Sequence, residues 1–253
     1  MPEGPSIVIL REQVQELQLE GSEVLEVSGN TGIDSSRMLG KRVIAFKSWG
    51  KHFLICFEAF SLRIHLMMFG TYRINERKDK PARLSLRFKN AELNFYTCSL
   101  KFIEEGLDTV YDWSADVMSD QWNPKAARKK MKQKEASLIC DILLDQHIFS
   151  GVGNIIKNEV LYRTGVHPLS TIKDLPSLKI SAVIREARQY SFDFLEWKKA
   201  FVLKKHWLVH TKKLCPLGHP IQKLYLGKTN RRTFFCTRCQ KLYNLIPQTQ
   251  LIL

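Results

Sequence analysis

The sequence predicts an α+β protein: an N-terminal helix plus an antiparallel β-sandwich, followed by a helical domain with a C-terminal β-ribbon. Three observations predict this fold class. Residues 23–104 hold short runs of β-branched and aromatic residues separated by turn signals. Residues 125–205 repeat apolar residues at helical spacing. Near the C-terminus, two clusters of metal-ligating residues flank a spacer of hairpin length.

The first element is a helix predicted over residues 6–21. Its apolar residues recur at helical spacing, Ser6 follows a proline as a suitable N-cap, and Gly21 is a suitable stop. Turn signals then separate six strand-like runs, which indicate a sandwich or barrel. These runs are residues 41–49, 52–57, 61–67, 70–74, 83–89 and 92–98.

Weak patterning over residues 108–124 predicts a linker, so we expect domains at 1–118 and 119–253. In the second domain, two predicted helices meet at the glycine-containing turn of residues 149–154. A helix, tight turn and helix in this order is typical of helix-turn-helix DNA-binding elements. Two further helices are predicted over about 171–190 and 192–205.

Composition excludes several classes of protein. The chain has 253 residues, of which 44% are hydrophobic, enough for a packed core. No apolar run approaches the roughly 18 residues of a membrane span, and no basic region precedes the short apolar stretch near the N-terminus. We therefore expect a soluble, unexported protein without a membrane partner.

Positive charge is concentrated in the second half. Residues 1–118 carry 15 Lys/Arg and 16 Asp/Glu, whereas residues 119–253 carry 24 Lys/Arg and 9 Asp/Glu. Such asymmetry indicates a polyanion partner bound mainly by the second half. Charge that only keeps the protein soluble explains the same counts, and composition alone does not separate the two interpretations.

The cysteines indicate one metal site in a reducing compartment. Three of the six are scattered, whereas the others lie in C-P-L-G-H at residues 215–219 and C-T-R-C at residues 236–239. Thiolate and imidazole ligands without a carboxylate are typical of a closed, structural zinc site. We expect one zinc ion within a β-ribbon finger over residues 213–243, with the ligands Cys215, His219, Cys236 and Cys239.

The N-terminal P-E-G-P, residues 2–5, suggests a nucleophile. Methionine before proline is normally removed, which leaves Pro2 with a free secondary amine. Such an amine attacks an aldehyde carbon to form an iminium ion, and Glu3 beside it is a candidate proton shuttle. Taken alone, Glu3 is equally explained as a residue that favours a helix N-terminus.

Four motifs in order resemble the formamidopyrimidine-DNA glycosylase / endonuclease VIII family of DNA repair enzymes, in its endonuclease VIII-like branch. They are P-E-G-P at residues 2–5, W-G-K-H at 49–52, G-V-G-N-x5-V-L-Y-R-x-G-x-H-P at 151–168 and R-x-T-F-F-C-x-x-C-Q at 231–240. The resemblance spans essentially the whole chain. It implies that DNA lies in a cleft between the two domains.

The resemblance also implies residue roles. Pro2 matches the nucleophile that attacks C1′, Glu3 the general acid/base, and Lys51 a turn lysine that contacts phosphates and aids proton transfer. Asn154 matches a phosphate-binding asparagine, and Arg231 a finger arginine that clamps phosphates. Because strand residues alternate, only one of Arg231 and its neighbour Arg232 can face DNA.

A base that leaves the stack leaves a gap to be filled. Met67, Met68 and Phe69 join two predicted strands and match the family's wedge loop; ordinary core packing at a strand end is the alternative. Ser6 stands where many members carry glutamate. In the 8-oxoguanine-specific branch of the family, the region that corresponds to residues 168–215 includes a glycine-rich loop that caps the flipped purine. Residues 191–207 hold no glycine, so the resemblance favours oxidised pyrimidines as substrates.

The resulting hypothesis is a bifunctional glycosylase/AP lyase of base excision repair. It would use a Pro2 Schiff base and β,δ-elimination on damaged DNA, double-stranded or with single-stranded character. We expect a monomer, nucleoid-associated in a bacterial cytoplasm or nuclear in a eukaryote. Two alternatives remain: a zinc-finger DNA-binding protein without catalysis, and an abasic-site lyase without base recognition.

Overall fold

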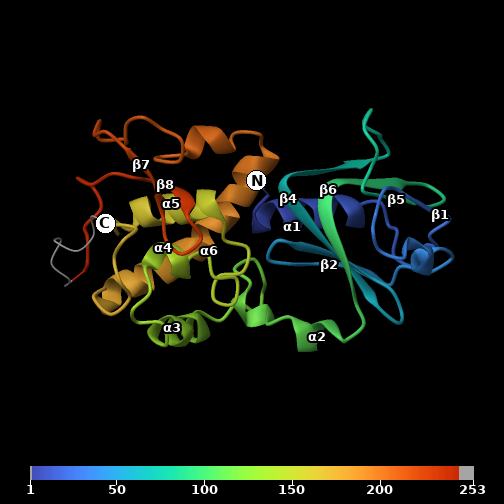
Figure 1. The fold of residues 1–253 in the computed structure, drawn as a ribbon, viewed down its shortest axis with the longest axis horizontal. Coiled ribbons are helices and arrows are strands. Elements are labelled where there is room, and N and C mark those ends of the chain that lie inside the picture. The colour runs from blue at the N-terminus through green and yellow to red at the C-terminus, as the bar shows by residue number, and fades with distance from the viewer. Residues whose placement is uncertain (1, 245–253) are drawn as a thin grey trace. The chain divides into compact units, whose positions relative to one another are not determined.

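A computed structural model describes residues 2–244 of the chain and divides it into two compact units, residues 1–113 and 114–253 (Figure 1). The boundary lies five residues before the one predicted from the linker pattern. Residues 114–118 belong to the second unit, because their backbone forms hydrogen bonds with it. The Val117 N–H, for example, donates to the Ser150 carbonyl at 3.2 Å. Within the described residues, no helix is both long and apolar enough to cross a membrane.

Helix α1, Gly4–Gln15, opens the first unit. It begins two residues earlier than predicted, because Pro5 fits the first turn of a helix. Glu3 therefore holds the N-cap position and Ser6 is a buried first-turn residue. The helix also ends before Gly21, in a turn where Gln18 adopts a φ of 53°.

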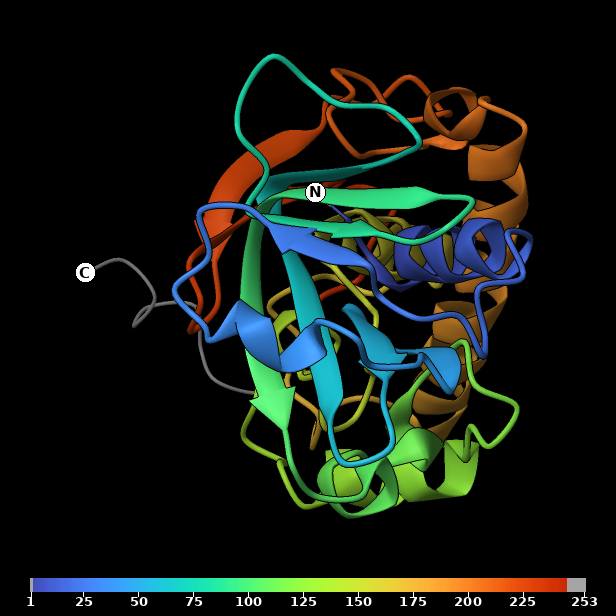
Figure 2. The same cartoon turned by 90° about the vertical axis from the view of Figure 1, so that its right-hand side faces the viewer.

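A six-stranded antiparallel sheet forms the rest of the first unit, in the order β1-β5-β6-β4-β3-β2. Its strands are β1 Glu26–Ser28, β2 Ala45–Trp49, β3 His52–Cys56, β4 Ser61–Ile74, β5 Leu84–Arg87 and β6 Glu92–Ile103. Buried residues of β2 and β3 and of β5 and β6 share one core with the apolar face of α1. Figure 2 shows α1 alongside this sheet. The strands that were predicted to form a sandwich are thus hydrogen-bonded into one sheet.

Strand β4 contains a bulge where the sequence predicts a break between two strands. Leu66 pairs with Cys98 and Thr71 with Tyr96, so residues 67–70 lie opposite a single residue of β6. That residue, Thr97, adopts a φ of 52°, in the left-handed region. The extra residues project from the sheet, and Met67, Met68 and Phe69 are 47%, 53% and 79% exposed.

The second unit is helical and ends in a hairpin. Its helices are α3 Pro124–Lys132, α4 Ile139–Ile142, α5 Asn154–Arg163 and α6 Ser177–Lys199, and its hairpin strands are β7 Gln222–Leu226 and β8 Arg231–Phe235. The predicted linker holds the short helices α2 Leu107–Val110 and Trp113–Ala115. One helix, α6, covers most of the two ranges predicted at 171–190 and 192–205, and a short 3-10 helix, Leu203–His206, follows it. Ser191 does not break α6, because its hydroxyl bonds to the Ala187 carbonyl of the same helix.

The bulge leads to a prediction about Gly70. A Cβ atom there would lie 2.7 Å from both the Met67 nitrogen and the Thr97 carbonyl oxygen, which are backbone atoms. Gly70→Ala should therefore lower the free energy of unfolding by about 2 kcal/mol or more, measured by urea denaturation. Gly106→Ala is the matched control, since no atom lies within 4 Å of its Cβ position. Equal effects of the two substitutions would contradict this account of the bulge.

Candidate functional site

Pro2 and Glu3 stand at the N-terminus of α1. Glu3 is fully buried, and its carbonyl accepts a hydrogen bond from the Ser6 N–H at 2.8 Å. Pro2 precedes it directly and is partly exposed. The positive end of α1 disfavours a protonated amine at this point of the chain. A buried carboxylate thus lies next in sequence to the predicted nucleophile.

Lys51 lies in the two-residue turn of the β2–β3 hairpin. Gly50 supplies a φ of 52°, and Trp49 pairs with His52 across the turn. Burial is the main cause that lowers the pKa values of His52 and His65, and the positive charge of Lys51 adds to both shifts. The hairpin therefore fixes the backbone of Lys51 while its side chain stays partly exposed.

An aromatic cluster of Trp49, His52 and Tyr111 packs next to this turn. The His52 Nδ1 atom and the Tyr111 hydroxyl lie 3.1 Å apart, and the rings of Trp49 and Tyr111 have centroids 4.8 Å apart. The Trp49 indole N–H donates to the Asp112 carbonyl at 3.0 Å. Burial, together with the neighbouring positive charges, lowers the pKa of His52 to about 3, so the imidazole is neutral at neutral pH. His52 lies within the W-G-K-H motif, but the sequence gives no signal for this contact with Tyr111, which is 59 positions away.

Asn154 is the first residue of α5 and contacts the hairpin. Its side-chain Nδ2 donates to the Arg232 carbonyl at 2.6 Å, and Gly153 holds the N-cap position. An amide nitrogen carries two hydrogens, so the second can still donate to a phosphate oxygen. The predicted phosphate role is therefore compatible with a structural one.

Three fully buried polar residues extend the contact between α5 and the chain around the hairpin. The Lys157 ammonium donates to the Thr233 hydroxyl at 2.7 Å, and Asn158 Nδ2 lies 3.0 Å from His210 Nδ1. Glu159 accepts the backbone N–H groups of residues 208–210, at 2.8, 3.0 and 2.8 Å. Burial nevertheless raises the pKa of Glu159. Sequence reasoning missed all three, because they occupy the variable positions of the quoted motif.

The two arginines of β8 point to opposite faces. The Arg232 guanidinium lies 5.5 Å from the centre of the Phe234 ring, on one face. Alternation places Arg231 with Thr233, the residue that Lys157 contacts, on the face toward α5. Both arginines are exposed, and Figure 1 shows β8 beside α5.

The four predicted metal ligands come together. One ligand atom each from Cys215, His219, Cys236 and Cys239 lies within 4.8 Å of the other three. The sulfurs of Cys215 and Cys239 are 3.7 Å apart, and His219 Nδ1 lies 3.3 Å from the Cys239 sulfur. A tetrahedral zinc site with Zn–S bonds of about 2.3 Å requires sulfurs about 3.8 Å apart. The residues therefore fit a four-coordinate metal ion.

The hairpin tip is fixed to the helical part of the second unit. Asp141 of α4 accepts the Lys228 N–H at 2.9 Å. Gly227, with a φ of 77°, begins the turn, and a Cβ atom there would collide with the Asp141 carboxylate. The turn lies within the β-ribbon finger predicted over residues 213–243, and the finger contacts both α4 and α5.

Both units of the chain match domains of known proteins. The formamidopyrimidine-DNA glycosylase N-terminal domain matches residues 1–102, and the H2TH domain of the same glycosylase matches residues 114–197. The chain belongs to the formamidopyrimidine-DNA glycosylase / endonuclease VIII family. This confirms the family resemblance and the fold class predicted from the sequence.

The curated relatives are endonuclease VIII-like members of the family. Endonuclease 8-like 3 of Xenopus laevis is 30% identical over 90% of this chain and 39% of its own length. Endonuclease 8-like 2 of Homo sapiens is 32% identical over 74% of this chain and 59% of its own length. The chain thus spans between about two fifths and three fifths of the length of these relatives.

Solved structures share the fold at lower identity. A viral DNA glycosylase aligns with a TM-score of 0.82 and 20% identity, over 94% of this chain and 100% of that one. The formamidopyrimidine-DNA glycosylase of Lactococcus lactis, non-covalently bound to DNA with an abasic site, aligns with a TM-score of 0.81 and 21% identity. That alignment covers 94% of this chain and 99% of the other.

The lowered pKa of the partly buried His52 predicts a specific loss of stability in acid. Its pKa is about 3 when folded, against an ordinary value of 6.5, so between these values the unfolded chain binds the extra proton. The free energy of unfolding should therefore fall as pH drops below 6.5. His52→Gln should reduce that fall by about 2–4 kcal/mol between pH 7 and pH 3, in urea titrations at each pH. An unchanged pH dependence would contradict the burial of a neutral imidazole.

Proposed function

We propose that this protein is a bifunctional DNA glycosylase/AP lyase of base excision repair that uses Pro2 as its nucleophile. The observation that carries the proposal is the N-terminus of α1. Pro2 stands at the positive end of this helix, and the adjacent Glu3 is fully buried. A DNA-binding protein without chemistry has no need for that pairing, whereas amine catalysis requires both a nucleophile and a proton shuttle.

The chemistry requires that Met1 be removed so that the Pro2 nitrogen is free. This nitrogen attacks C1′ of the damaged nucleotide and forms an N–C1′ bond as the bond to the base breaks. The base leaves with the proton that the Pro2 nitrogen gives up. Glu3 protonates the ring oxygen as the sugar opens to an iminium ion. Loss of a C2′ proton then expels the 3′ phosphate, and δ-elimination expels the 5′ phosphate. Hydrolysis of the iminium frees Pro2.

Damaged DNA is the proposed partner, with phosphate contacts from both units. Lys51 on its hairpin turn, Asn154 at the start of α5 and Arg231 on the α5 face of β8 supply the donors. Arg232 is the less suited of the two arginines, because its guanidinium lies over Phe234. All of these phosphate-binding groups belong to one chain, so we propose that the protein acts as a monomer.

Met67, Met68 and Phe69 are the proposed wedge. Their exposure on a bulge, rather than burial in the core, favours this role over packing at a strand end.

Oxidised pyrimidines are the proposed lesions, in duplex DNA or in DNA with single-stranded character. The segment over residues 191–207, which holds no glycine for a purine-capping loop, supports this choice.

Zinc is the proposed ion of the Cys215, His219, Cys236 and Cys239 cluster. Three sulfurs and one imidazole nitrogen favour zinc, and a closed four-ligand set leaves no position for a substrate. The ion would supply structural stability to the finger. The residues around it hold β8 in place and take no part in proton transfer.

Borohydride trapping on a duplex with an abasic site tests the proposal. The processed protein should form a covalent complex with DNA, and both Pro2→Gly and a form that retains Met1 should lose it while binding DNA with similar affinity. Pro81→Gly, at an exposed proline between β4 and β5, is the control and should trap normally.

A second readout on the same samples separates the two activities. Release of free base from a duplex containing thymine glycol should accompany trapping; trapping without base release would indicate a lyase alone. No trapping, despite salt-sensitive DNA binding and verified loss of Met1, would contradict the proposal and favour a DNA-binding protein without catalysis.

A further inference from the structure

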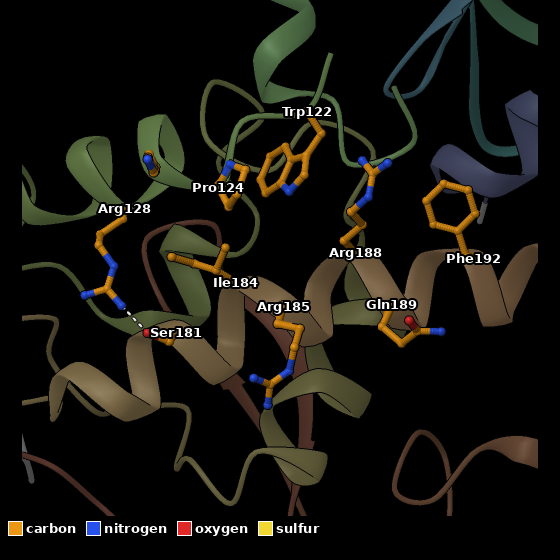
Figure 3. Close-up of a pocket in the computed structure, with 10 residues that line it drawn as sticks. Trp122, Pro124, Arg128, Ser181, Ile184, Arg185, Arg188, Gln189 and Phe192 are labelled. Carbon is orange, nitrogen blue, oxygen red and sulfur yellow. Dashed lines mark hydrogen bonds between the residues drawn. The ribbon is translucent and has the colours of Figure 1, made fainter. Parts of the chain in front are cut away.

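A recess between α3 and α6 lies within the second unit and has no part in the chemistry proposed above. Its volume is about 620 Å³, in the range of ligand-binding pockets. Aromatic and other apolar side chains share its lining with four lysine and arginine residues, and no acidic residue lines it among the described part of the chain. Figure 3 shows these side chains around the opening.

Trp122 provides an aromatic surface in the recess. Its ring packs against the buried Phe149, with centroids 5.7 Å apart, and remains partly exposed on the pocket side. Phe192 lines the recess from α6, with the Arg188 guanidinium 5.0 Å from its ring centre. Aromatic rings beside cations are the usual platform on which unpaired bases stack.

Two of the four cations are part of the wall. Arg128 donates to the Ser177 hydroxyl at 3.0 Å and also to the Ser181 hydroxyl. Arg188 donates to the Val117 and Ser119 carbonyls at 3.2 and 2.8 Å. These bonds connect α3 and the segment before it to α6, so the shape of the recess is fixed before any ligand arrives.

The other two cations are available to a ligand. The side chains of Lys125 and Arg185 are exposed and make no hydrogen bond or salt bridge with the described residues. Gln189 is also exposed. Its Nε2 donates to the Asp193 carboxylate at 2.8 Å, which leaves its carbonyl oxygen and its second amide hydrogen for the edge of a nucleobase. The recess therefore combines a stacking surface, two phosphate-binding groups and one group for a base edge.

Helix α3 extends the positive charge beyond the recess. Its nine residues include five lysines and arginines and no acidic residue. Lys129 and Lys132 are exposed on it, outside the recess. This continuation favours an extended polyanion over a compact ligand.

We propose that the recess between α3 and α6 binds single-stranded DNA. One unpaired base stacks on Trp122 and meets Gln189 at its edge, while flanking phosphates contact Lys125 and Arg185. A paired base cannot present its face to Trp122, so the site excludes intact duplex. It holds a single strand independently of the residues that carry the proposed chemistry.

Fluorescence anisotropy of a labelled oligo(dT) strand tests the proposal. The protein is first saturated with an unlabelled duplex containing a stable abasic analogue, which occupies the proposed lesion site. Oligo(dT) should still bind, and Lys125→Glu with Arg185→Glu should weaken it tenfold or more. Lys204→Glu with Lys205→Glu is the matched control: it makes the same change of charge in exposed residues outside the recess and should weaken binding less than threefold.

Two further strands separate stacking from charge. A strand made only of abasic analogues should bind more weakly than oligo(dT), and Trp122→Leu should abolish that difference. Affinity for the abasic-analogue duplex should be unchanged in all variants, which shows that they fold and that the lesion site is intact.

Three results would overturn the proposal. They are failure of oligo(dT) to bind beside the duplex, equal weakening by the two double variants, and equal affinity for strands with and without bases. Competition by poly-glutamate that matches unlabelled oligo(dT) would assign the recess to acidic peptides instead. None of these readouts requires catalysis, so a failure here is distinguishable from a failure of the proposed enzymatic activity.

Discussion

The buried carboxylate of Glu159 accepts three consecutive backbone N–H groups, and the functional geometry of the second unit depends on this interaction. A buried carboxylate without such partners would be strongly destabilising. The bonds fix residues 208–210, which precede Cys215, the first of the four predicted metal ligands. Lys157 and Asn154, on the same helix, bond to β8. Helix α5 thus positions the proposed phosphate-binding groups Asn154 and Arg231 relative to each other.

In the first unit, backbone geometry fixes the positions of the residues that are proposed to contact DNA. Hydrogen-bonded strands define the β2–β3 turn that carries Lys51, and the neutral His52 contacts Tyr111 beneath it. The bulge in β4 exposes three large apolar residues, because β6 offers a single residue opposite four. In both units, hydrogen-bonded secondary structure fixes the backbone of the residues proposed to contact DNA.

Periodicity and ligand spacing predicted much of this architecture. Local patterns predicted the strands, the β-ribbon within residues 213–243 and the clustering of four residues, Cys215, His219, Cys236 and Cys239. Helix ends were predicted less well, since Pro5 allowed α1 to begin early and Ser191 did not interrupt α6. The roles of Lys157, Asn158 and Glu159 could not be predicted, because each bonds to residues about 50 or more positions away.

Amide hydrogen exchange of residues 208–210 tests most directly whether Glu159 fixes α5 to the metal-binding finger. Glu159→Gln, which leaves one fewer acceptor, should speed exchange at these amides at least tenfold and also expose the amides of β8, with the metal still bound. Glu196→Gln, at an exposed glutamate of α6, is the matched control and should leave exchange unchanged. Removal of the metal by a chelator should also speed hydrogen exchange at the same amides. Protection that survives both Glu159→Gln and metal removal would contradict the account.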